Sequence, residues 1–280
     1  MSPTENAVLV RISTDDGPTW VLRSDAGDAH VPGGLAVLLG LSVDRARALL
    51  DKAKFGPRIE GALLAPVDEQ EVWAAGVTYE RSRDERMAES TEASIYDRVY
   101  TAERPEVFLK STAARVVAPG EPVGIRADSD WDVPEPELGL VFNAAGELFG
   151  FVPGNDMSSR SIEGENPLYL PQAKVYEAAC ALGPAIVPAW EATGPFGIGL
   201  TISRNDEVVF EGSTSTATIT RDFADLGAWL FAAMPFPAGA VLLTGTGIVP
   251  EEGFTLAAED VVTVSVEQIG TLINPVRVVG

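Results

Sequence analysis

The chain has 280 residues, of which 46% are hydrophobic, and this length suffices for one large domain and a small one. Its net charge of −21, from 20 basic and 41 acidic side chains, repels nucleic acids and anionic membrane surfaces. The single histidine, His30, and the single cysteine, Cys180, exclude an intrachain disulfide and zinc sites built from several His or Cys ligands.

Residues 1–68 are expected to form a small β-rich domain. Strands are predicted at 7–13 and 19–24, because β-branched and aromatic residues flank a turn-rich segment. A helix is predicted over 43–54, with Ser42 as its N-cap. The lone histidine is expected in a loop of this domain, where we find no sign of chemistry.

The rest of the chain, 69–280, is expected to be a larger domain with many strands and few helices. The charged segment 80–102 has apolar residues at helical spacing, which indicates a surface helix or helical pair, or alternatively a lid. One later helix is predicted at 222–234. This order is no βαβ alternation, so we expect a β-rich α+β fold. The predicted strands are 71–77, 106–110, 114–118, 137–142, 147–152, 197–203, 207–210, 214–220, 240–244 and 261–267.

Two glutamates, Glu135 and Glu137, are two residues apart in a predicted strand, so their side chains face the same side. Like charges so placed repel each other unless a cation lies between them. Pro134 and Pro136 cannot donate to a strand ladder, and this places the stretch at a sheet edge or a bulge.

A hairpin brings a third carboxylate to this pair. With the turn centred between residues 144 and 145, Glu135 would lie opposite residue 154, and Asp156 would lie just beyond. Three carboxylate ligands suit a hard cation, Mg²⁺ first and then Mn²⁺ or Ca²⁺. A solvated acidic strand edge would show the same spacing, so the pattern alone leaves both interpretations open.

Short motifs follow one another from residue 70 to the end of the chain. They are Gly76-Val-Thr-Tyr79, Pro105-Glu-Val-Phe-Leu-Lys110, Glu135-Pro-Glu137, Asn155-Asp156 with Arg160, Lys174, Leu182-Gly-Pro184, Thr244-Gly-Thr-Gly247 and Ile269-Gly-Thr-Leu-Ile-Asn-Pro275. In this order they resemble the fumarylacetoacetate-hydrolase-like family. Gly247 stands where the family's motif has proline.

The resemblance implies a distorted β-sandwich roll, often a homodimer, with a divalent metal on Glu135, Glu137 and Asp156. Members that hydrolyse carbon–carbon bonds carry a histidine and a glutamate that activate water. Here Ser82 and Glu85 occupy those positions. A serine without a partner is a poor base near neutral pH, so hydrolysis by that route is not expected.

The segments 76–90 and 159–174 resemble the sugar-acid dehydratases of that family. This implies magnesium-dependent dehydration of 2-dehydro-3-deoxy-D-pentonate, derived from D-xylonate or D-arabinonate, to 2,5-dioxopentanoate. Such a metal would polarise the C2 ketone and stabilise an enolate when a C3 proton leaves, and Lys174 is the expected base. The candidate general acids are Glu165, Glu163 and Glu85, and the candidate substrate contacts are Arg160, Ser82, Lys110, Asn166 and Thr246.

Two alternatives remain. One is another 2-oxo acid enzyme of the same family, an acylpyruvate hydrolase or an oxaloacetate decarboxylase, and the other is a non-catalytic binding protein with this fold. The intact carboxylates and Lys174 favour an enzyme, because buried charges without a function are costly. No signal-peptide pattern and no apolar run of about 20 residues is present, so we predict a cytoplasmic protein. The family resemblance implies a homodimer or a dimer-based oligomer.

Overall fold

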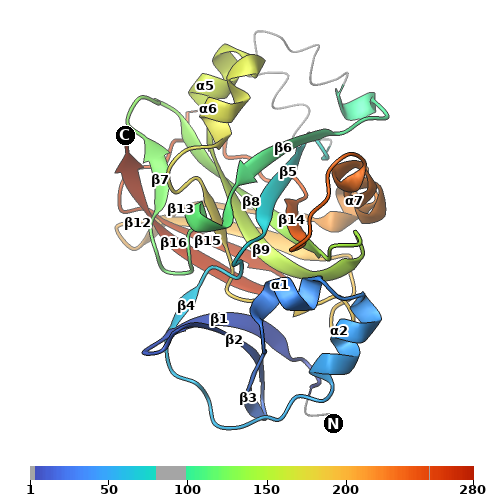
Figure 1. Cartoon of the computed structure of the whole chain (residues 1–280). Helices are drawn as coiled ribbons and strands as arrows, with labels where there is room; N and C mark the ends of the chain where they lie inside the picture. The colour runs from blue at the N-terminus through green and yellow to red at the C-terminus, as the bar shows by residue number, and fades with distance from the viewer. Residues whose placement is uncertain (1–3, 80–98, 252) are drawn as a thin grey trace.

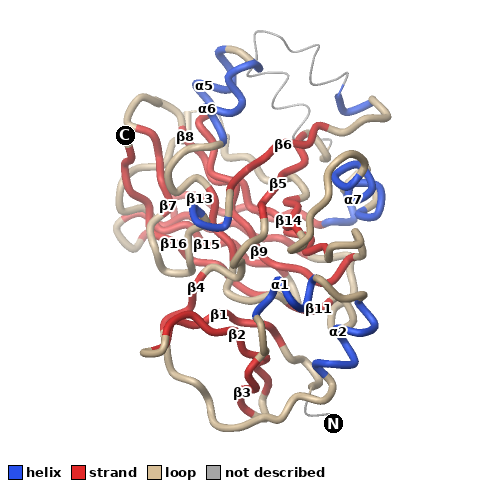
Figure 2. The backbone as a smooth tube through the Cα atoms, in the orientation of Figure 1, coloured by secondary structure: helices blue, strands red, loops and turns tan. Residues whose placement is uncertain are grey.

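The computed structural model describes residues 4–79, 99–251 and 253–280. A small N-terminal sheet lies at the bottom of Figure 1, and a larger body of strands lies above it. Helices lie at the margins of the strands, as the colours of Figure 2 show. Within these ranges, no helix is long and apolar enough to cross a membrane.

The N-terminal sheet has four strands in the order β3-β2-β1-β4. Both predicted strands of the first hairpin are confirmed, and the predicted helix ends earlier, at Leu50. His30 was expected in a loop, but it ends strand β3. The elements are β1 (Val8–Thr14), β2 (Gly17–Ser24), β3 (Gly27–His30), α1 (Gly34–Leu39), α2 (Val43–Leu50) and β4 (Ala62–Leu64).

The largest sheet runs β10-β9-β8-β14-β5-β6, with β11 also paired to β9. Strand β14 runs parallel to β5, and its other neighbour, β8, is antiparallel to it. The strands are β5 (Glu71–Gly76), β6 (Glu106–Ser111), β8 (Asp132–Phe142), β9 (Leu148–Ser159), β10 (Cys180–Leu182), β11 (Val187–Pro188) and β14 (Ala240–Leu243).

The third sheet has five strands in the order β13-β12-β15-β16-β7. Its strands are β7 (Val123–Arg126), β12 (Gly197–Arg204), β13 (Glu207–Ser215), β15 (Val261–Val266) and β16 (Gly270–Val279). The remaining helices are η1 (Ala113–Arg115), α5 (Arg160–Glu165), η2 (Pro167–Tyr169), α6 (Leu170–Lys174), η3 (Thr216–Thr218) and α7 (Phe223–Phe231).

Two predicted strands are wrong in part. The segment 114–118 begins in a 3₁₀ turn, and 214–220 continues β13 only to Ser215 before another 3₁₀ turn. Both segments contain β-branched residues, which favour strands, but the chain forms a local turn there instead. Most of the predicted helix at 80–102 lies outside the described residues.

Strand β8 is buried on both faces, and its side chains contribute to two apolar cores. Through these cores it packs against the other two sheets. Leu138, Leu140 and Phe142 face the core that lies against the five-stranded sheet. Val141 belongs to a second core, which also contains Leu38 of the N-terminal part. The larger body is therefore the expected α+β sandwich-like roll. Apolar packing is continuous across residues 68 and 69, and the domain boundary predicted there stays a prediction.

A substitution at Gly239 tests how tightly the N-terminal part packs onto strand β8. It has φ of +76°, and an added Cβ would lie 2.4 Å from the carbonyl oxygen of Phe142 and 2.6 Å from Leu39 Cδ1. We expect Gly239→Ala to lower the free energy of unfolding by about 2–4 kcal/mol, from left-handed strain plus the clash. Gly120 has φ of +83° and open space around it, so Gly120→Ala should cost only about 1 kcal/mol. Urea denaturation measures both, and equal losses would contradict this account.

Candidate active site

The β8–β9 hairpin sets the geometry of the site. Glu135 pairs directly with Asp156, two residues further along β9 than the predicted partner at 154. The turn is centred on Ala145, and the extra residue Phe149 forms a bulge; each shifts the register by one. Because the side-chain period of a strand is two, this shift leaves the carboxylates on the expected face.

The two prolines of β8 lie where the strand has only one neighbour. β9 pairs with the whole of β8, whereas β14 pairs only with 139–142. Pro134 and Pro136 therefore lie in a stretch whose second edge is free of ladder hydrogen bonds, as a residue without an N–H requires. The predicted sheet edge is confirmed for this half of the strand.

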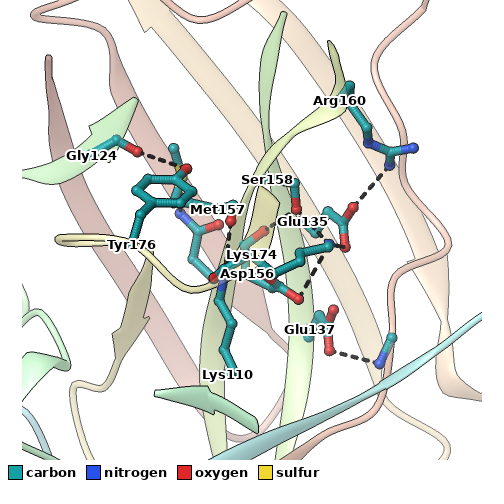
Figure 3. Close-up of polar contacts among 12 residues, drawn as sticks. Lys110, Gly124, Glu135, Glu137, Asp156, Met157, Ser158, Arg160, Lys174 and Tyr176 are labelled. Carbon is teal, nitrogen blue, oxygen red and sulfur yellow. Dashed lines mark hydrogen bonds and ion pairs between the residues drawn. The ribbon is translucent and has the colours of Figure 1, made fainter. Parts of the chain in front are cut away.

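The hairpin brings three buried carboxylates together, as Figure 3 shows. Glu135, Glu137 and Asp156 each offer an oxygen atom within 4.8 Å of the others. Glu137 Oε2 accepts a hydrogen bond of 2.7 Å from the backbone N–H of Gly245. Burial, and then the charges of the other two carboxylates, raise the pKa of Glu137 well above its usual value. The three carboxylates therefore form a buried cluster of like charges that repel one another.

Lys174 lies at the centre of this cluster. It is the last residue of α6, and its Nζ donates to Glu135 Oε2 at 2.8 Å and to Asp156 Oδ2 at 3.4 Å. A third bond, of 2.5 Å, joins Nζ to the hydroxyl of Ser158. The amine therefore touches two of the three carboxylates at once (Figure 3).

Arg160 reaches the same glutamate from another element. The Ser159 hydroxyl accepts a hydrogen bond from Ile162 N–H, which caps α5 directly after β9 ends. The chain turns there, and the Arg160 guanidinium donates to Glu135 Oε1 at 2.9 Å. Arg160 thus braces a member of the triad.

Lys110 braces the site from β6. Its Nζ lies 2.5 Å from Asp156 Oδ1 and donates to the carbonyl oxygens of Met157, at 2.8 Å, and Lys174, at 2.5 Å. Lys110 Nζ thus forms one ion pair with Asp156 and two hydrogen bonds to backbone carbonyls, and these contacts favour a bracing role over the substrate contact that the sequence suggested.

The remaining predicted site residues are placed by burial and local hydrogen bonds. Glu163 is buried in α5, whereas Glu165 is exposed at its end. Asn166 caps η2 by accepting from Leu168 N–H, and the Thr246 hydroxyl bonds the backbone of Ile248. Ser82 and Glu85 lie outside the described residues.

Two contributors were absent from the prediction, Ser158 and the N–H of Gly245. A serine in a strand and a backbone amide carry no chemical signature in a sequence. The motif Thr244-Gly-Thr-Gly247 was recognised in the sequence, but only Thr246 was assigned to the site. Cys180 pairs with Asp156 in the sheet, and burial raises the pKa of its thiol to about 12, as suits a core residue.

The donor set fits a hard divalent cation. Three carboxylates supply oxygen ligands, all are buried, and the like charges that raise the pKa of Glu137 would be neutralised by a cation. Mg²⁺ would be held by Glu135, Glu137 and Asp156, and water and substrate oxygens would supply its other ligands.

Comparisons with known proteins agree with this assignment. The model of the fumarylacetoacetate (FAA) hydrolase C-terminal family matches residues 71–277. A probable 2-keto-3-deoxyxylonate dehydratase of Haloferax volcanii is 44% identical over 272 residues, which cover 94% of each chain. A 2-dehydro-3-deoxy-D-arabinonate dehydratase of Saccharolobus solfataricus is 42% identical over 218 residues, 76% of this chain and 73% of that one.

A solved structure of similar shape contains a metal and a product-like ligand. It is a 2-keto-3-deoxy-D-arabinonate dehydratase complexed with magnesium and 2,5-dioxopentanoate. The two chains superpose with a TM-score of 0.85 at 34% identity, over 97% of this chain and 99% of that one.

Neutralising one carboxylate of the triad tests whether these three residues hold a metal ion. Glu137→Gln removes one of three repelling charges, so we expect the EDTA-treated variant to melt at a higher temperature than the EDTA-treated wild type. The wild type should gain about 2.7 kcal/mol of stability at a Mg²⁺ concentration 100 times its Kd, and the variant should lose most of this gain.

Thermal unfolding with EDTA or Mg²⁺ measures both effects. Glu69→Gln, which removes the same charge from an exposed position, should resemble the wild type in each condition. A Glu137→Gln variant that is stabilised by Mg²⁺ as strongly as the wild type would contradict the site.

Proposed function

The chain belongs to the fumarylacetoacetate (FAA) hydrolase C-terminal family, and from this premise we propose that it is a magnesium-dependent hydro-lyase. Its substrate is 2-dehydro-3-deoxy-D-pentonate and its product is 2,5-dioxopentanoate. The observation that carries the proposal is the buried carboxylate triad in contact with Lys174, in a chain that is 44% identical to a probable dehydratase.

The overall reaction removes one water and needs no redox partner. A proton leaves C3 and the hydroxyl leaves C4, which gives a C3–C4 double bond. A proton then moves from C5 to C3, and the resulting C4–C5 enol gains a proton at C4 as its hydroxyl loses one, so that C5 becomes the aldehyde carbon. The protein must therefore supply a base beside C3 and an acid beside the C4 oxygen. A bound Mg²⁺ would polarise the C2 ketone and make the C3 proton more acidic.

Lys174 is the base in this proposal. Its Nζ contacts Glu135 and Asp156, so it is the amine adjacent to a 2-oxo acid held at the triad. The bond from Nζ to Ser158 fixes the direction of the amine. Lys110, by binding the carbonyl oxygen of Lys174, holds the backbone from which this side chain extends.

Glu163 is the better placed of the two described candidates for the acid. It is buried in α5, close in sequence to Arg160, whereas Glu165 is exposed. An acid that protonates a leaving hydroxyl works best where water is excluded. A homodimer or a dimer-based oligomer and a cytoplasmic location remain part of the proposal.

A coupled assay tests the activity. The purified protein is incubated with 2-dehydro-3-deoxy-D-pentonate and Mg²⁺, with or without EDTA, and an NADP⁺-linked aldehyde dehydrogenase detects 2,5-dioxopentanoate. We expect product that EDTA abolishes and Mg²⁺ restores. Metal-loaded protein that leaves the substrate intact would refute the proposal, and oxaloacetate and acylpyruvates would be tried next.

Lys174→Met tests the base. We expect kcat to fall by about 10³-fold, within the range that general acid–base catalysis contributes. The Mg²⁺-dependent gain in melting temperature should persist, because the three carboxylates remain. Lys52→Met, at an exposed position of the N-terminal part, is the matched control. A variant with nearly full kcat would exclude Lys174 as the base.

A further inference from the structure

A pocket of about 470 Å³ is lined, among the described residues, by side chains that nearly all carry a hydroxyl group. We propose that it binds the hydroxylated end of the substrate, the C5 hydroxyl above all, and that Tyr79 is its buried hydrogen-bond donor. This inference rests on the function proposed above. The lining residues are Tyr79, Tyr100, Ser213, Thr214, Thr218, Thr220 and Gly247.

The chemistry of the lining selects an uncharged ligand. Six of these residues bear a hydroxyl, the seventh is glycine, and none of the side chains that line the pocket within the described ranges is charged. Hydroxyl groups both donate and accept, and they match the alcohol groups of a sugar chain. A carboxylate or a phosphate would lack a cationic partner in this lining. The acid and ketone groups of the substrate belong at the triad, so the polyol end is the part that fits.

Backbone contacts connect this pocket to the triad. Tyr79 follows β5, and the preceding hydroxyl, that of Thr78, donates to the carbonyl oxygen of Thr244 at 2.6 Å. The next residue of that loop, Gly245, donates to Glu137, and Gly247 lines the pocket. One short loop therefore touches both a triad carboxylate and the pocket.

The phenol of Tyr79 is poised to donate to a ligand. The residue is 2% exposed, and its hydroxyl has no hydrogen-bond partner within the described ranges. Leaving a buried polar group without a partner is unfavourable, and a hydrogen bond to a ligand hydroxyl would remove this cost. Burial, and then the charge of Glu137, raise the pKa of Tyr79, so the phenol keeps its proton.

Backbone strain occurs just before this tyrosine. Val77 has φ of +53°, a conformation that β-branched residues rarely adopt. Such strain persists only where the surrounding structure imposes it, and it is concentrated at functional sites. Here the turn at Val77 directs Thr78 to the loop and Tyr79 to the pocket.

Gly247 makes room for the donor. An added Cβ would lie 2.6 Å from Tyr79 Cδ1 and 2.6 Å from Thr214 Oγ1. The related motif has proline here, whose ring would need still more space. The absence of a side chain at Gly247 thus lets the ring of Tyr79 and the hydroxyl of Thr214 both lie against this residue.

Two substrates that differ only at C5 test the proposal. They are 2-dehydro-3-deoxy-D-pentonate and 4-hydroxy-2-oxopentanoate, which lacks the C5 hydroxyl but keeps the leaving group at C4. Proton NMR follows water loss from both. For the wild type, kcat/KM should favour the pentonate by about 10- to 100-fold, as expected for a site built to hydrogen-bond a hydroxyl.

Tyr79→Phe keeps the ring and removes the donor, so we expect the preference for the pentonate to fall by about 10-fold or more. Gly247→Ala and Thr214→Val should lower the same ratio. Thr201→Val removes a hydroxyl from β12, away from the pocket lining, and should leave the ratio at the wild-type value. The Mg²⁺-dependent rise in melting temperature shows that each variant is folded with an intact triad.

The outcomes separate the two proposals. A wild type inactive on both substrates refutes the proposed function and, with it, the pocket assignment. A wild type that is active on the pentonate, with Tyr79→Phe and Gly247→Ala losing equal factors on both substrates, refutes the pocket assignment alone.

Discussion

The repulsion among three buried carboxylates is the constraint on which the rest of the structure depends. Glu135, Glu137 and Asp156 lie close together only because the hairpin pairing of β8 with β9 holds them there. Folding alone would disfavour such a cluster, since each charge is removed from water beside two others. The surrounding cationic side chains and amide groups compensate for this cost.

The cationic and amide partners are shared unequally among the three carboxylates, and Glu137 receives the weakest of them. Lys174 and Arg160 both contact Glu135, and Lys110 and Lys174 contact Asp156, whereas Glu137 accepts a hydrogen bond from a backbone N–H. The amide supplies a partial charge, which is weaker than an ammonium or a guanidinium. A divalent cation held by the three carboxylates would complete the balance on that side.

The sequence predicted the triad and Lys174, because carboxylates at a strand period of two and a motif order are visible in one dimension. The register was two residues wrong, since neither the turn centre at Ala145 nor the bulge at Phe149 is marked in the sequence. Helix α1 was missed because it has only six residues, begins with the second glycine of a pair, and has no polar face that would give a helical period. The pocket at Tyr79 could not be foreseen, since its hydroxyls come from distant segments that only the fold brings together.

The apolar core shared across the two parts of the chain has a consequence for cooperativity. Leu35 and Leu38 of α1 pack in one cluster with Val141, Phe149 and Val241 of the largest sheet. The strand that carries two triad glutamates therefore has one face covered by the N-terminal part. The two parts cannot melt independently without exposing this face to water, so unfolding far from the carboxylates would also release the metal.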